Sequence, residues 1–280
     1  MAARLLEGRP AADAIWSEVS TGAKKFSDAT DRPPTLALVS GSDEAAAAYG
    51  RQIERQFARR GLSVAHATVD AAGFADHVRG LNADPGIDGI LVLTPLPEGV
   101  GAEAAALAID PSKDVDGQHP TNLGRIGQRR PAFAPATALG GLRLLKHYAV
   151  PLQGTRVVVV GRSPVVGMPL ALLLIDADAT VTICHSRTRE MAAVTREADL
   201  LCVAIGRAGL ITPEHVKPGA VVIDFGTNPT PDGPLVGDVQ TDAVAEIASA
   251  ITPVPGGAGP MTVAVLAEQT LRAANVRRGR

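Results

Sequence analysis

The chain has 280 residues and a formal net charge of −2, which is enough length for two domains of ordinary size. Hydrophobic residues make up 46% and charged residues 20%, which excludes a disordered chain, and the near-neutral charge gives no basis for nucleic-acid binding. Aromatic residues are only 3%, so we expect a core of aliphatic side chains.

No apolar stretch approaches the ~20 residues that span a bilayer, and the first residues lack the apolar segment of a signal peptide. The two cysteines, Cys184 and Cys202, lie in apolar, strand-like runs without C-x-x-C spacing. We therefore expect buried free thiols, no metal site, and a cytoplasmic protein without membrane or nucleic-acid partners.

Short apolar runs alternate with amphipathic helical patterns along the chain. The predicted strands cover residues 35–39, 64–69, 89–93, 156–160, 180–184, 200–205 and 220–224. Several of these runs are apolar throughout, which is typical of strands buried on both faces of a parallel sheet. The alternation predicts an α/β fold with right-handed crossovers.

The chain divides near residues 120–150. A predicted helix at 138–148 precedes the second series of strands, which begins after Gly154. A Pro- and Gly-rich loop at 252–260 then leads into a predicted C-terminal helix from Met261 to about Ala274.

A nucleotide-binding turn is predicted after the strand of valines at 157–160. Gly161, Arg162 and Ser163 follow that strand, and Gly167 begins a helical run. A helix N-terminus at such a turn directs backbone N–H groups and a positive dipole end at a phosphate. The spacing differs from G-x-G-x-x-G, so the alternative is an ordinary strand-to-helix turn. The strands that follow in the same rhythm favour the phosphate site.

Cofactor choice is indicated by the end of the next predicted strand. An NAD site usually offers an acidic residue there, whereas this chain offers Ser186 and Arg187. A hydroxyl and a guanidinium suit a 2′-phosphate, so we predict NADP rather than NAD. The alternative for Arg187 is a solvated loop residue. Thr227, after the strand ending at Asp224, is a candidate for nicotinamide-side contact or for a structural turn.

Blocks of residues nearly from end to end resemble one known family. They are Gly89-Ile90-Leu91-Val92 with Pro95-Leu96-Pro97, Lys113-Asp114-Val115-Asp116-Gly117, Gly161-Arg162-Ser163-x-x-Val166-Gly167-x-Pro169, Cys184-His185-Ser186-Arg187-Thr188, Ile223-Asp224-x-Gly226, Gly237-Asp238-Val239 and residues 252–262. In these blocks the chain resembles the methylenetetrahydrofolate dehydrogenase/methenyltetrahydrofolate cyclohydrolases, the FolD-type enzymes.

The resemblance implies two domains. A folate domain would comprise residues 1–138 and 262–280, and a Rossmann-type, doubly wound parallel sheet would comprise residues 139–261. It implies NAD(P)-dependent oxidation of 5,10-methylenetetrahydrofolate to the 5,10-methenyl compound. In most members hydrolysis to 10-formyltetrahydrofolate follows. Homodimers are usual.

The resemblance also implies site residues. Tyr49 would stack on the folate, and Asp116 would accept hydrogen bonds from the pterin N–H groups; both are candidate catalytic residues. Pro255, Gly256 and Gly257 would line the folate pocket. The alternatives are a core aromatic for Tyr49 and a turn or helix-capping aspartate for Asp116.

Among the departures from the family pattern, two bear on the hydrolytic step. Ile53 stands where Tyr-x-x-x-Lys would place a lysine one helical turn after Tyr49, and Leu93 stands at the position of a glutamine. The resemblance links that lysine and glutamine to the hydrolytic step. A buried lysine can change its protonation state, isoleucine cannot, and the nearby Arg51 and Arg55 are poor general bases.

Hydride transfer needs alignment of the reacting carbons rather than a proton carrier. We therefore predict an NADP-dependent dehydrogenase whose cyclohydrolase activity is weak or lost. The alternatives are a fully bifunctional enzyme in which Arg51, Arg55 or an ordered water replaces the lysine, a dehydrogenase for a modified folate or other one-carbon carrier, and a non-catalytic NADP- or folate-binding paralogue.

Overall fold

The computed structural model describes residues 3–230 and 233–279, and the chain forms two compact units. The six-stranded unit comprises Met1–Ala12 and Thr137–Thr262, and the three-stranded unit comprises Asp13–Ala136 and Val263–Arg280. The chain passes from one unit to the other within the helices α1 (Gly8–Thr30), α6 (Ala136–His147) and α10 (Gly259–Arg278).

The three-stranded unit is built on a parallel sheet. Its strand order is β3 (Ser63–Thr68), β2 (Thr35–Ser40), β4 (Gly89–Val92). Its helices include α2 (Glu44–Ala58), α3 (Ala71–Ala83), α4 (Ala102–Ala108) and α5 (Pro120–Gly127). Asp43 and Asp70 accept hydrogen bonds from backbone N–H groups in the first turns of α2 and α3, which explains where these helices begin.

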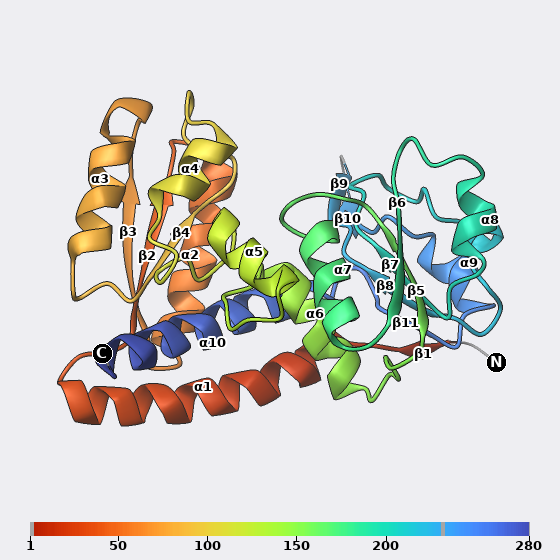
Figure 1. Cartoon of the computed structure of the whole chain (residues 1–280), viewed down its shortest axis with the longest axis horizontal. Helices are drawn as coiled ribbons and strands as arrows, with labels where there is room; N and C mark the ends of the chain where they lie inside the picture. The colour runs from red at the N-terminus through yellow and green to blue at the C-terminus, as the bar shows by residue number, and fades with distance from the viewer. Residues whose placement is uncertain (1–2, 231–232, 280) are drawn as a thin grey trace. The chain divides into compact units, whose positions relative to one another are not determined.

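The two faces of this sheet are covered differently. On one face Ala37 and Val39 of β2 pack against Phe74 and Val78 of α3. The other face bears Leu38 and Ser40 and is covered by α2. Residues 13–30 of α1 and 263–278 of α10 run side by side (Figure 1), and Gly22 leaves room for the side chain of Leu271.

The six-stranded unit is also parallel. Its order is β1 (Arg4–Leu5), β11 (Ala250–Ile251), β8 (Val221–Asp224), β7 (Leu200–Val203), β5 (Arg156–Val160), β6 (Thr180–Cys184). Helices α6 and α7 (Gly167–Asp176) cover one face, and α8 (Met191–Thr195) and α9 (Thr241–Ala245) cover the other (Figure 1). This is the doubly wound arrangement predicted from the sequence. The strands β9 (Asn228–Thr230) and β10 (Gly233–Val236) form a separate antiparallel pair.

The predicted strands β5 and β6 have the observed bounds, and the other five differ at their ends by one or two residues. Four short strands, β1, β9, β10 and β11, were not predicted. The pairing of β1 with β11 places residues 4–5 in the six-stranded sheet, whereas the sequence-based division assigns residues 1–138 to the other domain. Main-chain hydrogen bonds hold this strand, and a two-residue strand has no side-chain periodicity to detect.

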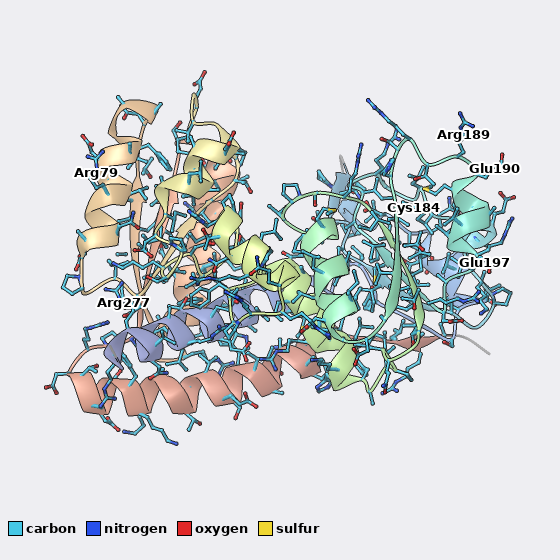
Figure 2. The ribbon with its side chains drawn as sticks, viewed as in Figure 1. Arg79, Cys184, Arg189, Glu190, Glu197 and Arg277 are labelled. Carbon is cyan, nitrogen blue, oxygen red and sulfur yellow. The ribbon has the colours of Figure 1, made fainter. Side chains whose placement is uncertain are left out.

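Both cysteines are buried free thiols, as predicted. Figure 2 labels Cys184, which ends β6. Burial raises the pKa of Cys202 to about 12, so this side chain stays a thiol at neutral pH. Within residues 3–230 and 233–279, no helix combines the length and apolar character that crossing a membrane requires.

Candidate active site

The three-stranded unit brings together two of the predicted site residues, Tyr49 and Asp116. Burial of the phenol, together with the negative field of Asp116, raises the pKa of Tyr49 to about 12. Tyr49 is only partly covered, on the flank of α2 beside its buried face. An aromatic ring and a carboxylate are therefore available at one place in this unit.

The carboxylate of Asp116 is held by two hydrogen bonds and can still accept others. One carboxylate oxygen accepts a hydrogen bond from Gln118 Nε2 at 2.5 Å, and the other accepts from the backbone N–H of Ala136 at 3.0 Å. Desolvation raises the pKa of Asp116 to about 6, although these two hydrogen bonds act in the opposite direction. Each oxygen has a second lone pair, so the ionised carboxylate can accept hydrogen bonds from further N–H groups.

The two residues that begin the Lys113-to-Gly117 block have structural roles. The Nζ atom of Lys113, which is 1% exposed, donates to the carbonyl oxygens of Leu81 and Asp84, both at 2.6 Å. Asp114 accepts from the backbone N–H of His119 at 2.8 Å and from the Asn122 amide at 2.8 Å. These contacts fix the loop that presents Asp116.

Ile53 and Leu93 are buried. Ile53 is 0% exposed on the face of α2 that packs on the sheet, and Leu93 is 2% exposed directly after β4. Arg51 and Arg55 are exposed on the same helix, and the Arg51 guanidinium lies 3.7 Å from Glu44. The positions that the resemblance assigns to lysine and glutamine are therefore apolar, and both arginines lie toward solvent.

A cluster that sequence reasoning missed lies beside these apolar positions. Ser40 Oγ lies 3.0 Å from His66 Nε2, and His66 Nδ1 lies 2.7 Å from Glu54 Oε1. We call Ser40, His66 and Glu54 the polar cluster. Its members come from β2, β3 and α2, so no local spacing in the sequence relates them; the one available signal was a histidine within a predicted strand.

Gly50 makes room for this cluster. A Cβ atom at position 50 would lie 2.6 Å from His66 Cε1 and 3.2 Å from Leu93 Cδ1. A side chain there would therefore push the imidazole aside. Gly50 follows Tyr49 directly, so α2 contacts the polar cluster and Leu93 next to the candidate folate-stacking residue.

In the six-stranded unit, the predicted phosphate turn lies where the strand order reverses. β6 and β7 lie on either side of β5, and ligands of such sheets bind at the carboxyl ends of these strands. Gly161 follows β5 with φ of 127°, and a side chain there would collide with the carbonyl oxygen of Ala204 after β7. Ser163 Oγ accepts from Val166 N at 3.2 Å, and Arg162 is exposed.

The residues predicted to select NADP lie in a tight turn after β6. His185 N donates to Thr188 Oγ1 at 2.9 Å, and Arg187 N donates to His185 Nδ1 at 3.1 Å. The side chains of Ser186 and Arg187 are exposed in this turn. An exposed hydroxyl and guanidinium at the carboxyl end of the strand next to β5 have the donor chemistry that a 2′-phosphate requires.

Asp238, which the sequence analysis placed in a family block without a role, is a buried carboxylate. It is 0% exposed and accepts from the three consecutive backbone N–H groups of residues 205–207 at 2.6–2.9 Å, and from Asn228 Nδ2 at 2.9 Å. Asp238 thereby ties the loop after β7 to the segment after β8 that contains Thr227, whose side chain is exposed.

Asp224 supports the same region from the end of β8. Its carboxylate accepts from the backbone N–H groups of Gly226 at 2.7 Å, Val239 at 2.9 Å and Asp238 at 3.2 Å. Desolvation, with a smaller contribution from Asp238, raises the pKa of Asp224 to about 6. Gly237 must lack a side chain because a Cβ there would collide with the Asp224 carboxylate.

Pro255, Gly256 and Gly257 lie in the loop before α10, within the six-stranded unit. The carbonyl oxygen of Gly256 accepts from Gly8 N at 2.8 Å. A Cβ at Gly257 would lie 2.6 Å from the Pro253 carbonyl oxygen. The packing of the loop itself therefore requires glycine at this position. Their contact with folate stays a prediction, as do the cofactor roles of Gly161, Arg162, Ser163, Ser186, Arg187 and Thr227.

Two family models match the two parts of the chain. Residues 6–116 match the tetrahydrofolate dehydrogenase/cyclohydrolase catalytic domain, and residues 135–278 match the NAD(P)-binding domain of the same family. The chain belongs to the tetrahydrofolate dehydrogenase/cyclohydrolase family.

Individual members of this family are similar over their full length. The chain is 46% identical to the bifunctional protein FolD of Chloroflexus aurantiacus, with all of both chains covered. It is 49% identical to the bifunctional protein FolD of Parafrankia sp., covering 97% of this chain and 99% of that one.

Solved structures agree with the fold. The bifunctional FolD of Campylobacter jejuni matches with a TM-score of 0.94 at 35% identity, covering 99% of this chain and 100% of that one. The Trypanosoma brucei FolD, solved with NADP cofactor and an inhibitor, matches with a TM-score of 0.93 at 34% identity, covering 100% of this chain and 99% of that one. The fold class predicted from the sequence is therefore confirmed.

Proposed function

We propose that this family member oxidises 5,10-methylenetetrahydrofolate to 5,10-methenyltetrahydrofolate with NADP+, and that its cyclohydrolase activity is weak. The observation that carries the second part is the burial of Ile53 at 0% exposure and of Leu93 at 2%. Neither hydrocarbon side chain can accept or donate a proton. A general acid or base typically contributes ~10²–10⁴-fold to such a step, so its loss is a large deficit.

The oxidation places different demands on the site. When bound, the nicotinamide supplies the hydride-accepting carbon, and the protein must align it with the methylene carbon. Tyr49 would orient the folate by stacking on it, and Asp116 would orient it by accepting hydrogen bonds from the pterin N–H groups. Arg187 and Ser186 would hold the 2′-phosphate. None of these roles requires the missing lysine.

Supplying methenyltetrahydrofolate directly tests the hydrolytic half of the proposal. We expect its absorbance to decay in the presence of the protein only slightly faster than in buffer, while a separate assay with methylenetetrahydrofolate and NADP+ shows clear cofactor reduction. Fast hydrolysis would support the fully bifunctional alternative, which the names of the two bifunctional FolD relatives favour. Binding of both ligands without turnover would support a non-catalytic paralogue.

The preference for NADP is tested at the turn after β6. We expect Arg187→Ala to weaken NADP+ binding by about 1.5–3 kcal/mol, because one charge-assisted interaction with the 2′-phosphate is lost. NAD+ carries no such phosphate, so its affinity should change little. Titration of both cofactors by calorimetry measures the two effects, and an equal loss for both would contradict the assignment.

Ionisation of the buried Asp116 should lower the stability of the fold while it favours folate binding. Its folded pKa of about 6 lies above the usual value of 3.8, so its stabilising contribution is complete below pH 3.8 and is lost as the pH rises through 6. Asp116→Asn should therefore gain stability relative to wild type between pH 4 and pH 7, and should bind folate analogues more weakly at pH 7. Urea unfolding at the two pH values measures the first effect; an unchanged difference would contradict it.

The remaining sequence-based expectations stay predictions. Equilibrium ultracentrifugation, which gives the molecular mass in solution, tests for a homodimer. Cell fractionation tests for a cytoplasmic location. Substrates other than the unmodified folate would be revealed by a low rate with methylenetetrahydrofolate despite tight NADP+ binding.

A further inference from the structure

Asp116 and Gln118 form a pair of polar side chains at a tight turn. Gly117 between them has φ of 62°, and a Cβ there would lie 2.5 Å from the backbone carbonyl carbon of Ala134, so the turn requires glycine. Gln118 Nε2 lies 2.5 Å from Asp116 Oδ2. Both residues are partly exposed, so a ligand can reach the pair.

Buried groups anchor the backbone on both sides of this pair. The Asp114 carboxylate accepts from the backbone N–H of Gln118 at 3.1 Å. Gln269, which is 1% exposed on α10, donates through Nε2 to the carbonyl oxygens of Val115 at 2.6 Å and Ala134 at 2.8 Å. Its Oε1 atom accepts from Ala134 N at 3.0 Å. The pair is therefore held in place before a ligand binds, which lowers the entropic cost of binding.

The contact with Asp116 fixes the direction of the Gln118 amide. An ionised carboxylate only accepts hydrogen bonds, so the atom 2.5 Å from Asp116 Oδ2 belongs to the NH₂ group of Gln118. This contact uses one of the two N–H bonds. Among residues 3–230 and 233–279, the Gln118 side chain has no second hydrogen-bond partner, so its other N–H can donate to a ligand.

The pair thus presents two acceptors followed by a donor. The two oxygens of Asp116 are bonded to one carbon and lie about 2.2 Å apart. Gln118 Nε2 lies 2.5 Å from the second oxygen. On a 2-amino-4-oxopyrimidine ring, the 2-amino group, N3–H and O4 are also joined through single ring carbons, at a similar spacing of about 2.2 Å. That edge presents two donors followed by an acceptor, which is the complement of the pair.

We propose that Gln118 is a specificity-determining residue that selects the 4-oxo form of the pterin. Its second N–H donates to O4 while Asp116 accepts from the 2-amino group and N3–H. The inference rests on the proposed function, because it takes Asp116 as the acceptor for the pterin N–H groups. A 2,4-diamino ring has an N–H donor at position 4 and no hydrogen on N3, so it would place a donor against the donor of Gln118.

The test compares folic acid with 4-amino-4-deoxyfolic acid, which has an amino group in place of the 4-oxo group. Calorimetric titration of the full chain at pH 8 keeps Asp116 ionised, because its pKa is about 6. We expect the wild-type protein to bind folic acid at least about tenfold more tightly. Gln118→Met should lower the affinity for folic acid about tenfold without weakening binding of the 4-amino compound, so the preference is lost.

Gln128→Met is the matched control, because it makes the same substitution at an exposed glutamine at the end of α5. This variant should keep the wild-type preference. Thermal melting verifies that the variants are folded. Gln118→Ala also removes the amide and should lose the preference in the same way, so it keeps the test valid if Gln118→Met does not fold.

A purely orienting role for Gln118 has a different signature. Both probes carry the 2-amino group that Asp116 would accept, so misplacing Asp116 would weaken both by the same factor. Equal losses, an unchanged preference in the Gln118 variants, or a wild-type protein without the preference would each overturn the inference. A wild-type protein that prefers folic acid but does not oxidise methylenetetrahydrofolate with NADP+ would support the inference and contradict the proposed function.

Discussion

Ile53→Lys combined with Leu93→Gln should raise the cyclohydrolase rate by about 100-fold or more, the size of effect that a general acid or base typically supplies. Ile53 is fully buried against the sheet, so a lysine there would be desolvated, which lowers the pKa of its amine toward neutrality and makes it a usable base. Leu93 directly follows β4, and a glutamine at this position would offer an amide oxygen as hydrogen-bond acceptor for that amine.

Two control variants separate the chemistry from general effects of substitution. Gln52→Lys adds a lysine at the adjacent, exposed position of the same helix and should leave hydrolysis unchanged. Ile53→Met keeps an apolar side chain of similar volume, without a titratable group, at the buried position and should do the same. Hydrolysis of methenyltetrahydrofolate is measured after thermal melting confirms folding. A folded double variant with no gain would contradict the assignment of the deficit to these positions.

Asp238→Asn should cost about 3 kcal/mol or more of stability and weaken NADP+ binding at least about tenfold. The Asp238 carboxylate accepts from the three N–H groups of residues 205–207 and from Asn228. An asparagine of the same size presents an NH₂ group to some of these donors, leaving buried N–H groups without acceptors. The loops after β7 and β8 would then lose the geometry at the carboxyl edge where the cofactor is proposed to bind.

The effect should be confined to one unit of the protein. Asp242→Asn, which changes an exposed aspartate on α9, is the matched control and should leave stability and cofactor affinity unchanged. Chemical unfolding measures the stability, and calorimetry at a temperature well below the melting point measures NADP+ binding. If Asp238→Asn binds NADP+ as tightly as wild type, Asp238 has no role in shaping the cofactor site.

The parts of the fold that were predictable have strong local signals. β5 and β6 are five-residue runs with clear ends, and the sequence predicts their bounds. β1 and β11 are two residues long and exist because their main chains pair with each other and with β8, so tertiary structure alone defines them. The antiparallel pair β9 and β10 is mostly exposed and lacks a clear apolar pattern.

Some residues of the candidate site were predictable from the sequence, and others were not. The resemblance to a family located Tyr49 and Asp116, and the structure brings these two residues together. The polar cluster required three elements to pack, because Ser40, Glu54 and His66 are separated by more than ten residues in the chain. Such contacts follow from strand register and helix packing, which local sequence patterns do not specify.

We propose that the protein oxidises its substrate and only weakly hydrolyses the product. The most direct measurement mixes the protein with methylenetetrahydrofolate and NADP+ and follows reduced cofactor and methenyltetrahydrofolate together at two wavelengths. We expect both products to accumulate nearly in parallel, with a shortfall of the methenyl compound little greater than its hydrolysis in buffer. Rapid disappearance of the methenyl compound while reduced cofactor continues to rise would contradict it.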